Sequence, residues 1–219
     1  ISLERVKRAR SLKPGAIQVI LPDWYPPRMD EIIDYLQTMA KAADIIGLVI
    51  YNPPHAKRKL TPEEYNQIKK AGIPIVGCKV AGGDAKWYAD MQKLVPELSL
   101  FVPGHTLASG FRMGANGSYS NAACLHPGVA QQWYETMLTN MDDALELESR
   151  LRTFINDYIV PYILQKEYSS QAVDKLLAAI GGWADIGTRL RWPYHGINNE
   201  EVLKLRKECR FLLPEFFPK

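Results

Sequence analysis

Short apolar segments alternate with amphipathic segments through the first half of the chain, and this alternation limits the folds that the chain can adopt. Periodicity predicts strands at residues 16–21, 45–50, 73–79, 98–102 and 117–119, and helices at residues 2–12, 29–43, 61–70, 84–94 and 106–113. Thr61, followed by proline in the first turn, is expected to cap the helix at residues 61–70. The strand segments are apolar on both faces, which is typical of parallel strands covered by helices. The sequence therefore predicts an α/β fold in which the strands form an open sheet or part of a barrel.

The second half of the chain differs, because no strand is predicted after residue 126. Helices are expected at residues 127–140, 141–159, 171–180 and 199–213. We therefore expect two parts. Residues 1–125 form a partial, barrel-like part that carries the strand ends, and residues 126–219 hold its last helix and a C-terminal helical layer.

Composition excludes several classes of protein. The 219 residues are 47% hydrophobic and 23% charged, with a net charge of +3, which is too small to indicate a nucleic-acid partner. The three cysteines lie far apart and form no C-x-x-C pair, which argues against a disulfide framework or a zinc site and favours a reducing compartment, the cytoplasm. The apolar runs are too short to cross a bilayer, so no membrane association is expected.

Lys79 is the most informative single residue, because it ends a strand that is otherwise apolar. Ile75, Gly77 and Lys79 share one face of this strand, and a Gly-Gly turn and a potential helix cap, Asp84, follow it. Gly77, beside Lys79 on this face, is expected to leave room for a bound substrate. Burial disfavours the charged form of an amine and lowers its pKa, which is the state that Schiff-base chemistry requires. On these residues alone, a lysine that reaches from the strand end into solvent is an equally good interpretation.

In parallel α/β folds, functional groups collect at the carboxyl ends of the strands. Tyr51 follows the second predicted strand and has the same face parity as Val49, so its hydroxyl can lie beside Lys79 and carry protons. A core tyrosine with no catalytic role is the alternative. The other strand ends supply Trp24 and Tyr25, Gly104 and His105, and Tyr119 and Ser120. Trp24 and Tyr25 could equally form a packed lid, and His105, with no second ligand at metal-binding spacing, is interpreted as a loop residue.

These residues resemble a known family. Tyr51-Asn52-x-Pro54, followed by Gly77-x-Lys79 and Gly82-Gly83-Asp84, is similar to the signature of the dihydrodipicolinate synthase / N-acetylneuraminate lyase family. Gly104 and the segment 114–121 also resemble the later strand ends of that family, and the similarity covers nearly the whole chain.

The resemblance implies a TIM (β/α)8 barrel with a C-terminal helical extension, assembled as a homotetramer or dimer. It also implies a class I aldolase or lyase without a metal or other cofactor, in which a 2-oxo acid such as pyruvate forms an imine on Lys79 and Tyr51 relays protons. The remaining strand-end residues are then expected to bind the substrate, namely Trp24, Tyr25, Gly104, Tyr119 and Ser120.

The sequence departs from the family pattern in three places. The first three β/α units of the barrel, with the loop that holds the pyruvate carboxylate, are apparently absent from the sequence. Ala56 stands where dihydrodipicolinate synthases carry the arginine that binds the carboxylate of the aldehyde, with Lys57 and Arg58 as possible substitutes. Trp24 occupies the place of a tyrosine that assists the neighbouring subunit.

The acceptor that reacts with the imine therefore stays open between an aldehyde and a sugar acid. Three alternatives remain beside a dihydrodipicolinate synthase-like enzyme. One is a sugar-acid dehydratase or aldolase of the same family, and another is a barrel that binds a small molecule without catalysis. The third is an inactive fragment in which Lys79 only caps the barrel.

Overall fold

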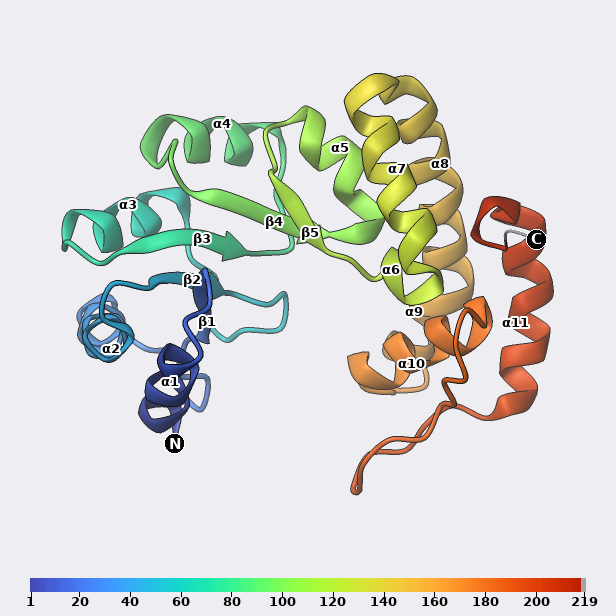
Figure 1. Cartoon of the computed structure of the whole chain (residues 1–219), viewed down its shortest axis with the longest axis horizontal. Coiled ribbons are helices and arrows are strands. Elements are labelled where there is room, and N and C mark those ends of the chain that lie inside the picture. Colours follow the sequence, from blue (N-terminus) through green and yellow to red (C-terminus); the bar gives the residue numbers. More distant parts are fainter. Residues whose placement is uncertain (218–219) are drawn as a thin grey trace. The chain divides into compact units, whose positions relative to one another are not determined.

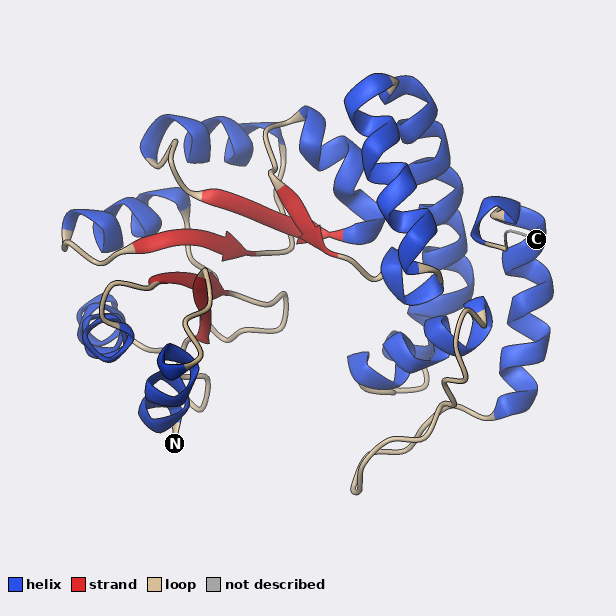
Figure 2. Cartoon of the chain, in the orientation of Figure 1, coloured by secondary structure: helices blue, strands red, loops and turns tan. Residues whose placement is uncertain are grey.

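Parallel strands form one sheet in the order β1-β2-β3-β4-β5, which follows the sequence (Figures 1 and 2). The structure is a computed structural model that describes residues 1–217. Its strands are β1 (Ala16–Ile20), β2 (Gly47–Tyr51), β3 (Ile75–Lys79), β4 (Ser99–Pro103) and β5 (Gly117–Tyr119). The pairs β1–β2, β2–β3 and β3–β4 are parallel, as predicted.

Helices alternate with these strands, as the sequence predicts. The helix α1 (Ser2–Ser11) precedes β1, and α2 (Met29–Ala43), α3 (Pro62–Lys70) and α4 (Ala85–Leu94) connect β1 to β2, β2 to β3 and β3 to β4. In Figure 1, α2, α3 and α4 follow one side of the sheet. Because the paired strands run parallel, their carboxyl ends, which precede these helices, lie along one edge of the sheet.

Local sequence fixes where two of these helices begin. Thr61 and Glu64 form a reciprocal capping box at α3, with Thr61 Oγ1 accepting the Glu64 amide hydrogen at 3.3 Å and Glu64 accepting that of Thr61 at 2.9 Å. Asp84 caps α4 by accepting the amide hydrogen of Trp87 at 2.8 Å. Both caps were predicted from the sequence, and they limit the lengths of the loops that follow β2 and β3.

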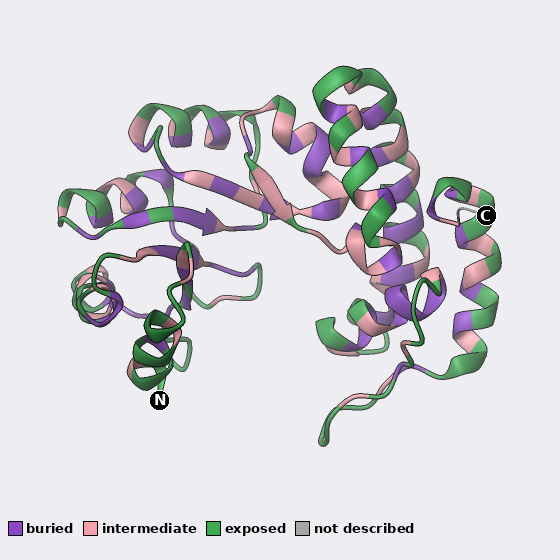
Figure 3. Cartoon of the chain, viewed as in Figure 1, coloured by how far each residue is buried: buried purple, intermediate pink, exposed green. Residues whose placement is uncertain are grey.

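The predicted burial of both faces is wrong for β1. Ile17 and Val19 are buried, but Gln18 and Ile20 on the other face are exposed, with Ile20 at 49%. Figure 3 shows burial along the chain, with buried and exposed stretches alternating along its helices. The central strand β2 fits the prediction better, because Leu48, Val49 and Ile50 are all buried. A strand at the edge of a sheet has a neighbour on one side only, so less of it is covered.

The chain divides into two compact units, each described here by itself. Unit 1 contains residues 1–102 and 113–118, and unit 2 contains residues 103–112 and the chain from Tyr119 onward. The predicted domain boundary after residue 125 stays a prediction.

Unit 2 is helical beyond the end of β5. Its helices are α5 (Leu107–Arg112), α6 (Ala122–Leu125), α7 (Pro127–Thr139), α8 (Met141–Phe154), α9 (Val160–Leu164), α10 (Ser170–Gly181) and α11 (Asn199–Leu212). Residues 141–159 are helical, as predicted, but the helix is not regular, because α8 ends at Phe154 and continues as a π-helix, Ile155–Ile159. Pro161 explains the break, since it has no amide hydrogen for a regular helical bond and its ring crowds the preceding turn.

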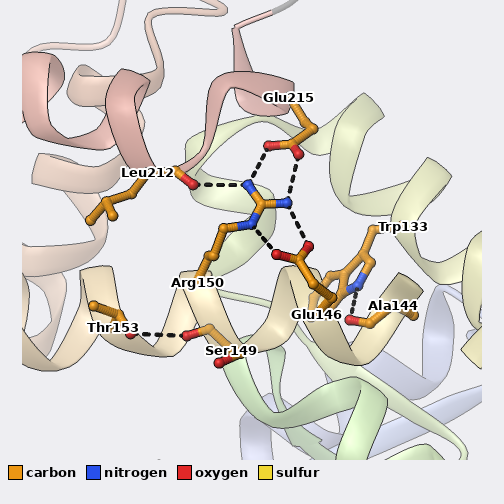
Figure 4. A network of polar contacts seen from close by, with 8 residues as sticks. All are labelled: Trp133, Ala144, Glu146, Ser149, Arg150, Thr153, Leu212 and Glu215. Atoms are coloured by element: carbon orange, nitrogen blue, oxygen red, sulfur yellow. Dashed lines mark hydrogen bonds and ion pairs between the residues drawn. The ribbon is translucent and has the colours of Figure 1, made fainter. Parts of the chain in front are cut away.

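Arg150 of α8 fastens the C-terminal segment of unit 2 (Figure 4). Its guanidinium donates to both carboxylate oxygens of Glu215 (2.7 and 3.0 Å) and of Glu146 (2.8 and 2.9 Å), and to the carbonyl of Leu212 at 2.9 Å. Only a planar fork of donors can satisfy these acceptors together. The contact holds the short helix Pro214–Phe216, in which Phe216 is fully buried.

We predict that Arg150→Met lowers the free energy of unfolding by about 1–2 kcal/mol, because the partly exposed guanidinium makes several charge-assisted bonds. Arg150→Lys should recover less than half of the loss, because an ammonium lacks the fork. Urea unfolding measures both effects, with Lys207→Met on the exposed face of α11 as the control. Equal stability of Arg150→Met and the unchanged protein would show that the network contributes nothing.

Candidate active site

Three side chains form a row across the sheet near its carboxyl edge. Tyr51 of β2 is the register partner of Lys79 of β3, which in turn is the partner of Phe101 of β4. Register partners on neighbouring strands project from the same face. The Nζ of Lys79 lies 4.1 Å from the centre of the Tyr51 ring, a cation–π distance. The structure thus brings together the two residues predicted to be catalytic.

The opposite face of β3 shows which way Lys79 points. The preceding residue, Cys78, is fully buried next to Tyr65 of α3. Burial raises the pKa of the Cys78 thiol to about 12, and the neighbouring Tyr65 hydroxyl partly offsets this rise. Since side chains alternate along a strand, Lys79 projects from the face that lies away from α3. Its side chain is half-buried.

The expectation that Gly77 leaves room for a substrate is wrong. A Cβ at Gly77 would lie 3.0 Å from the carbonyl oxygen of Ser99 and 3.1 Å from the ring of Phe101. A Cβ at Gly117 of β5 would lie 3.3 Å from the same ring. The two glycines therefore make room for Phe101, which packs over the sheet beside Lys79.

Asn52 links the ends of β2 and β3. Its backbone amide donates to the carbonyl of Lys79 at 3.0 Å. Its buried side chain closes the loop after β2, accepting the amide hydrogen of Leu60 at 2.8 Å and donating to the carbonyl of Arg58 at 2.9 Å. A buried amide with both ends satisfied holds one geometry, so Asn52 fixes the backbone between Tyr51 and α3.

The loops after β1 and β2 are fastened to each other. Lys57 donates through Nζ to the carbonyl of Trp24 at 2.7 Å and through its backbone amide to Asp23 at 2.8 Å. Arg58 donates to the carbonyl of Pro27 at 2.7 Å and pairs with Glu64. Both cations considered as substitutes for a carboxylate-binding arginine are thus engaged within the protein.

The predicted substrate-binding residues of these loops do not pack against the row. The side chain of Trp24 is 94% exposed and that of Tyr25 is 80% exposed. The interpretation as a packed lid is therefore wrong for these side chains, and their predicted role in substrate binding stays a prediction.

The remaining predicted residues lie in unit 2, where two of them are in close contact. A Cβ at Gly104 would lie 2.2 Å from Ser120 Oγ and 2.8 Å from Asn121 Oδ1, so only glycine allows the two turns to approach this closely. The side chain of Tyr119 is 46% exposed. The contact brings the turn after β4 and the turn after β5 together.

Sequence reasoning missed Phe101, Asn52, Asn121 and His105. His105 was interpreted as a loop residue, but its backbone amide donates to Asn121 Oδ1 at 3.0 Å and its Nδ1 lies 2.9 Å from Asn121 Nδ2. The sequence positions of Asn52, His105 and Asn121 could have indicated these contacts, because each of the three directly follows a strand or a strand-end residue. Phe101 carried no signal, since an aromatic residue in an apolar strand is ordinary.

Within residues 1–217, no group of three or more His, Cys, Asp and Glu side chains is placed to hold a metal ion. No helix in the same range is long and apolar enough to cross a membrane.

Comparison with known proteins places the chain in a family. The profile of the Dihydrodipicolinate synthetase family matches residues 2–210. The chain belongs to this family. This confirms the resemblance drawn from the Tyr51 and Lys79 motifs.

Two curated relatives are enzymes with different substrates. The 4-hydroxy-tetrahydrodipicolinate synthase of Alkaliphilus oremlandii is 23% identical over 213 residues, which cover 95% of this chain and 70% of the relative. A 2-dehydro-3-deoxy-D-gluconate/2-dehydro-3-deoxy-phosphogluconate aldolase of Picrophilus torridus is 23% identical over 132 residues, 59% of this chain and 49% of the relative. The chain therefore belongs to a family of lyases and aldolases, and it spans between half and about 70% of these relatives.

The fold agrees with the family assignment. The chain superposes on a prophage protein of the dihydrodipicolinic acid synthase family from E. coli K12, solved in complex with pyruvate, with a TM-score of 0.78 at 16% identity. The match covers 96% of this chain and 70% of that protein. This likeness confirms the predicted fold class, an α/β fold of the TIM-barrel type.

The close approach at Gly104 yields a prediction. In Gly104→Ala the new methyl group overlaps Ser120 and Asn121, so we expect the free energy of unfolding to fall by about 1–3 kcal/mol. Gly15→Ala is the matched control, because nothing lies within 4 Å of a Cβ at that position. Thermal unfolding measures both variants, and a loss at Gly104 no larger than that at Gly15 would contradict the packing described here.

Proposed function

We propose that the protein is a class I aldolase or lyase in which a 2-oxo acid, pyruvate or a close analogue, forms a Schiff base with Lys79. The observation that carries this proposal is the pairing of Lys79 and Tyr51 on one face of neighbouring strands, with Nζ 4.1 Å from the tyrosine ring. Membership of a family of lyases and aldolases supports it, as does pyruvate bound to the E. coli relative.

The proposed chemistry assigns a task to each residue. The unprotonated amine of Lys79 adds to the carbonyl carbon and forms a carbinolamine. The carbonyl oxygen then leaves as water, which leaves a C=N bond that withdraws electrons from the neighbouring carbon. The Tyr51 hydroxyl transfers the protons that these steps require. Trp24, Tyr25, Gly104, Tyr119 and Ser120 are proposed to bind the substrate.

A sugar-acid aldolase or dehydratase is the second candidate for the reaction of this imine. The engagement of Lys57 and Arg58 within the protein favours it, because neither cation is available to hold a second carboxylate as an arginine at position 56 would. The relative from Picrophilus torridus acts as an aldolase of this kind. A homotetramer or dimer in the cytoplasm, without metal, is part of the same proposal.

We predict that borohydride reduction in the presence of pyruvate adds one reduced pyruvate to Lys79, because reduction traps the imine as a stable amine. Mass spectrometry of peptides locates the adduct, and Lys79→Met should abolish it. Lys59→Met serves as a control for lysine loss at the same edge of the sheet. The absence of an adduct would contradict the proposed aldolase or lyase activity and favour a barrel that only binds small molecules.

We also predict that Tyr51→Phe slows turnover by about 10²- to 10⁴-fold, the usual contribution of a positioned acid or base. The variant keeps the ring beside Lys79, so pyruvate should still bind. Assays with pyruvate and a panel of simple and sugar-derived aldehydes measure turnover and identify the preferred acceptor. Full activity of Tyr51→Phe would remove Tyr51 from the mechanism.

A further inference from the structure

A pair of hydrogen bonds joins the turn after β4 to the turn after β5 within unit 2. The backbone amide of His105 donates to Asn121 Oδ1 at 3.0 Å, and Asn121 Nδ2 lies 2.9 Å from His105 Nδ1. A backbone N–H can only donate, so it fixes the amide oxygen toward itself and the amide nitrogen toward the ring. His105 Nδ1 must therefore be an acceptor, which makes the ring neutral.

A protonated ring cannot make the same pair of bonds. Both ring nitrogens then carry hydrogens, so Nδ1–H would face the hydrogens of Asn121 Nδ2. Turning the amide over would place Nδ2 against the backbone N–H instead. Either orientation leaves two donors opposed, so one of the two hydrogen bonds is lost.

We propose that His105 and Asn121 form a latch that is closed when His105 is neutral, opens in acid, and holds the ends of β4 and β5 in the arrangement that substrate binding needs. The latch joins the two turns at their closest approach, where a Cβ on Gly104 would lie 2.2 Å from Ser120 Oγ. His105 and Asn121 are thus positioning residues. This consequence for the substrate rests on the proposed function, in which Gly104 and Ser120 bind the 2-oxo acid.

The surroundings of His105 keep it neutral. Desolvation lowers the pKa of its ring, and the charges that act on it are those of Arg152, which lowers the pKa, and Glu148, which raises it. Both residues lie on α8. Glu148 is buried and accepts the amide hydrogen of Ser109 at 3.0 Å, so its carboxylate is committed to the start of α5.

The lowered pKa of His105 determines how the stability that the latch provides depends on pH. An unfolded histidine binds a proton near pH 6.5, and His105 in the folded protein does so only at lower pH. The stability that the latch provides is therefore complete above about pH 6.5 and is lost as the pH falls below that value.

The first test measures the pyruvate KM of the full chain by borohydride trapping at several pH values. We expect a rise of roughly tenfold as the pH is lowered from about 7.5 into the range, below about pH 6.5, in which His105 takes up a proton, the cost of one lost, partly buried hydrogen bond. In His105→Asn a neutral amide oxygen replaces Nδ1 and does not titrate, so KM should stay low across this range. His195→Asn, at an exposed position, should keep the pH dependence of the unchanged protein. Identical profiles for His105→Asn and the unchanged protein would overturn the proposal.

The second test uses a variant in which the pH dependence of the pyruvate KM should run in the opposite direction. In Asn121→Asp a carboxylate accepts from the backbone N–H and also from the protonated Nδ1–H, so the latch should close in acid and loosen above neutral pH. KM should then fall as the pH is lowered. An Asn121→Asp variant that still loses affinity in acid would also overturn the proposal.

A third measurement separates the latch from the proposed chemistry. The free energy of unfolding of the unchanged protein should fall below about pH 6.5 by more than that of His105→Asn, whether or not pyruvate binds. A missing imine with this stability difference intact defeats the proposed function alone. An imine that forms without the stability difference defeats the latch alone.

Discussion

The parallel register of β2, β3 and β4 is the constraint on which the candidate site depends. It aligns Tyr51, Lys79 and Phe101 in one row. The Lys79 amine therefore lies against the Tyr51 ring, and Phe101 is its register partner on the other side. A shift by one residue would turn Lys79 toward α3, where Cys78 is fully buried. The position of the lysine beside Tyr51 is therefore set by strand pairing.

Polar side chains then hold the strand ends, because the loops there have little apolar area to bury. Asn52 ties the end of β2 to the backbone of Lys79, and Lys57 and Arg58 tie the loop after β2 to the loop after β1. Asn121 does the same between the turns after β4 and β5. Lys57, Arg58 and Asn121 bond through their side chains to backbone groups of the neighbouring strand-end loop, whereas Asn52 bonds to Lys79 through its own backbone amide.

These hydrogen bonds and ion pairs change the interpretation of Lys57 and Arg58 in the loop after β2. From the sequence, Lys57 and Arg58 were candidates to hold a substrate carboxylate. In the structure Arg58 bridges a carbonyl and Glu64, and Lys57 reaches the carbonyl of Trp24. A cation that holds two loops together is not available to a ligand without loosening them, so these residues shape the site rather than select an anionic acceptor.

The sequence by itself determined the α/β class, the order of strands and helices, the caps at Thr61 and Asp84, and the pairing of Tyr51 with Lys79. All of these follow from local periodicity and parity, which short stretches of sequence contain. Tertiary structure alone decided that Phe101 fills the space over Gly77, that α8 breaks before Pro161, and that His105 bonds to Asn121. Each of these depends on which side chain arrives from a distant segment, and a linear pattern does not contain that information.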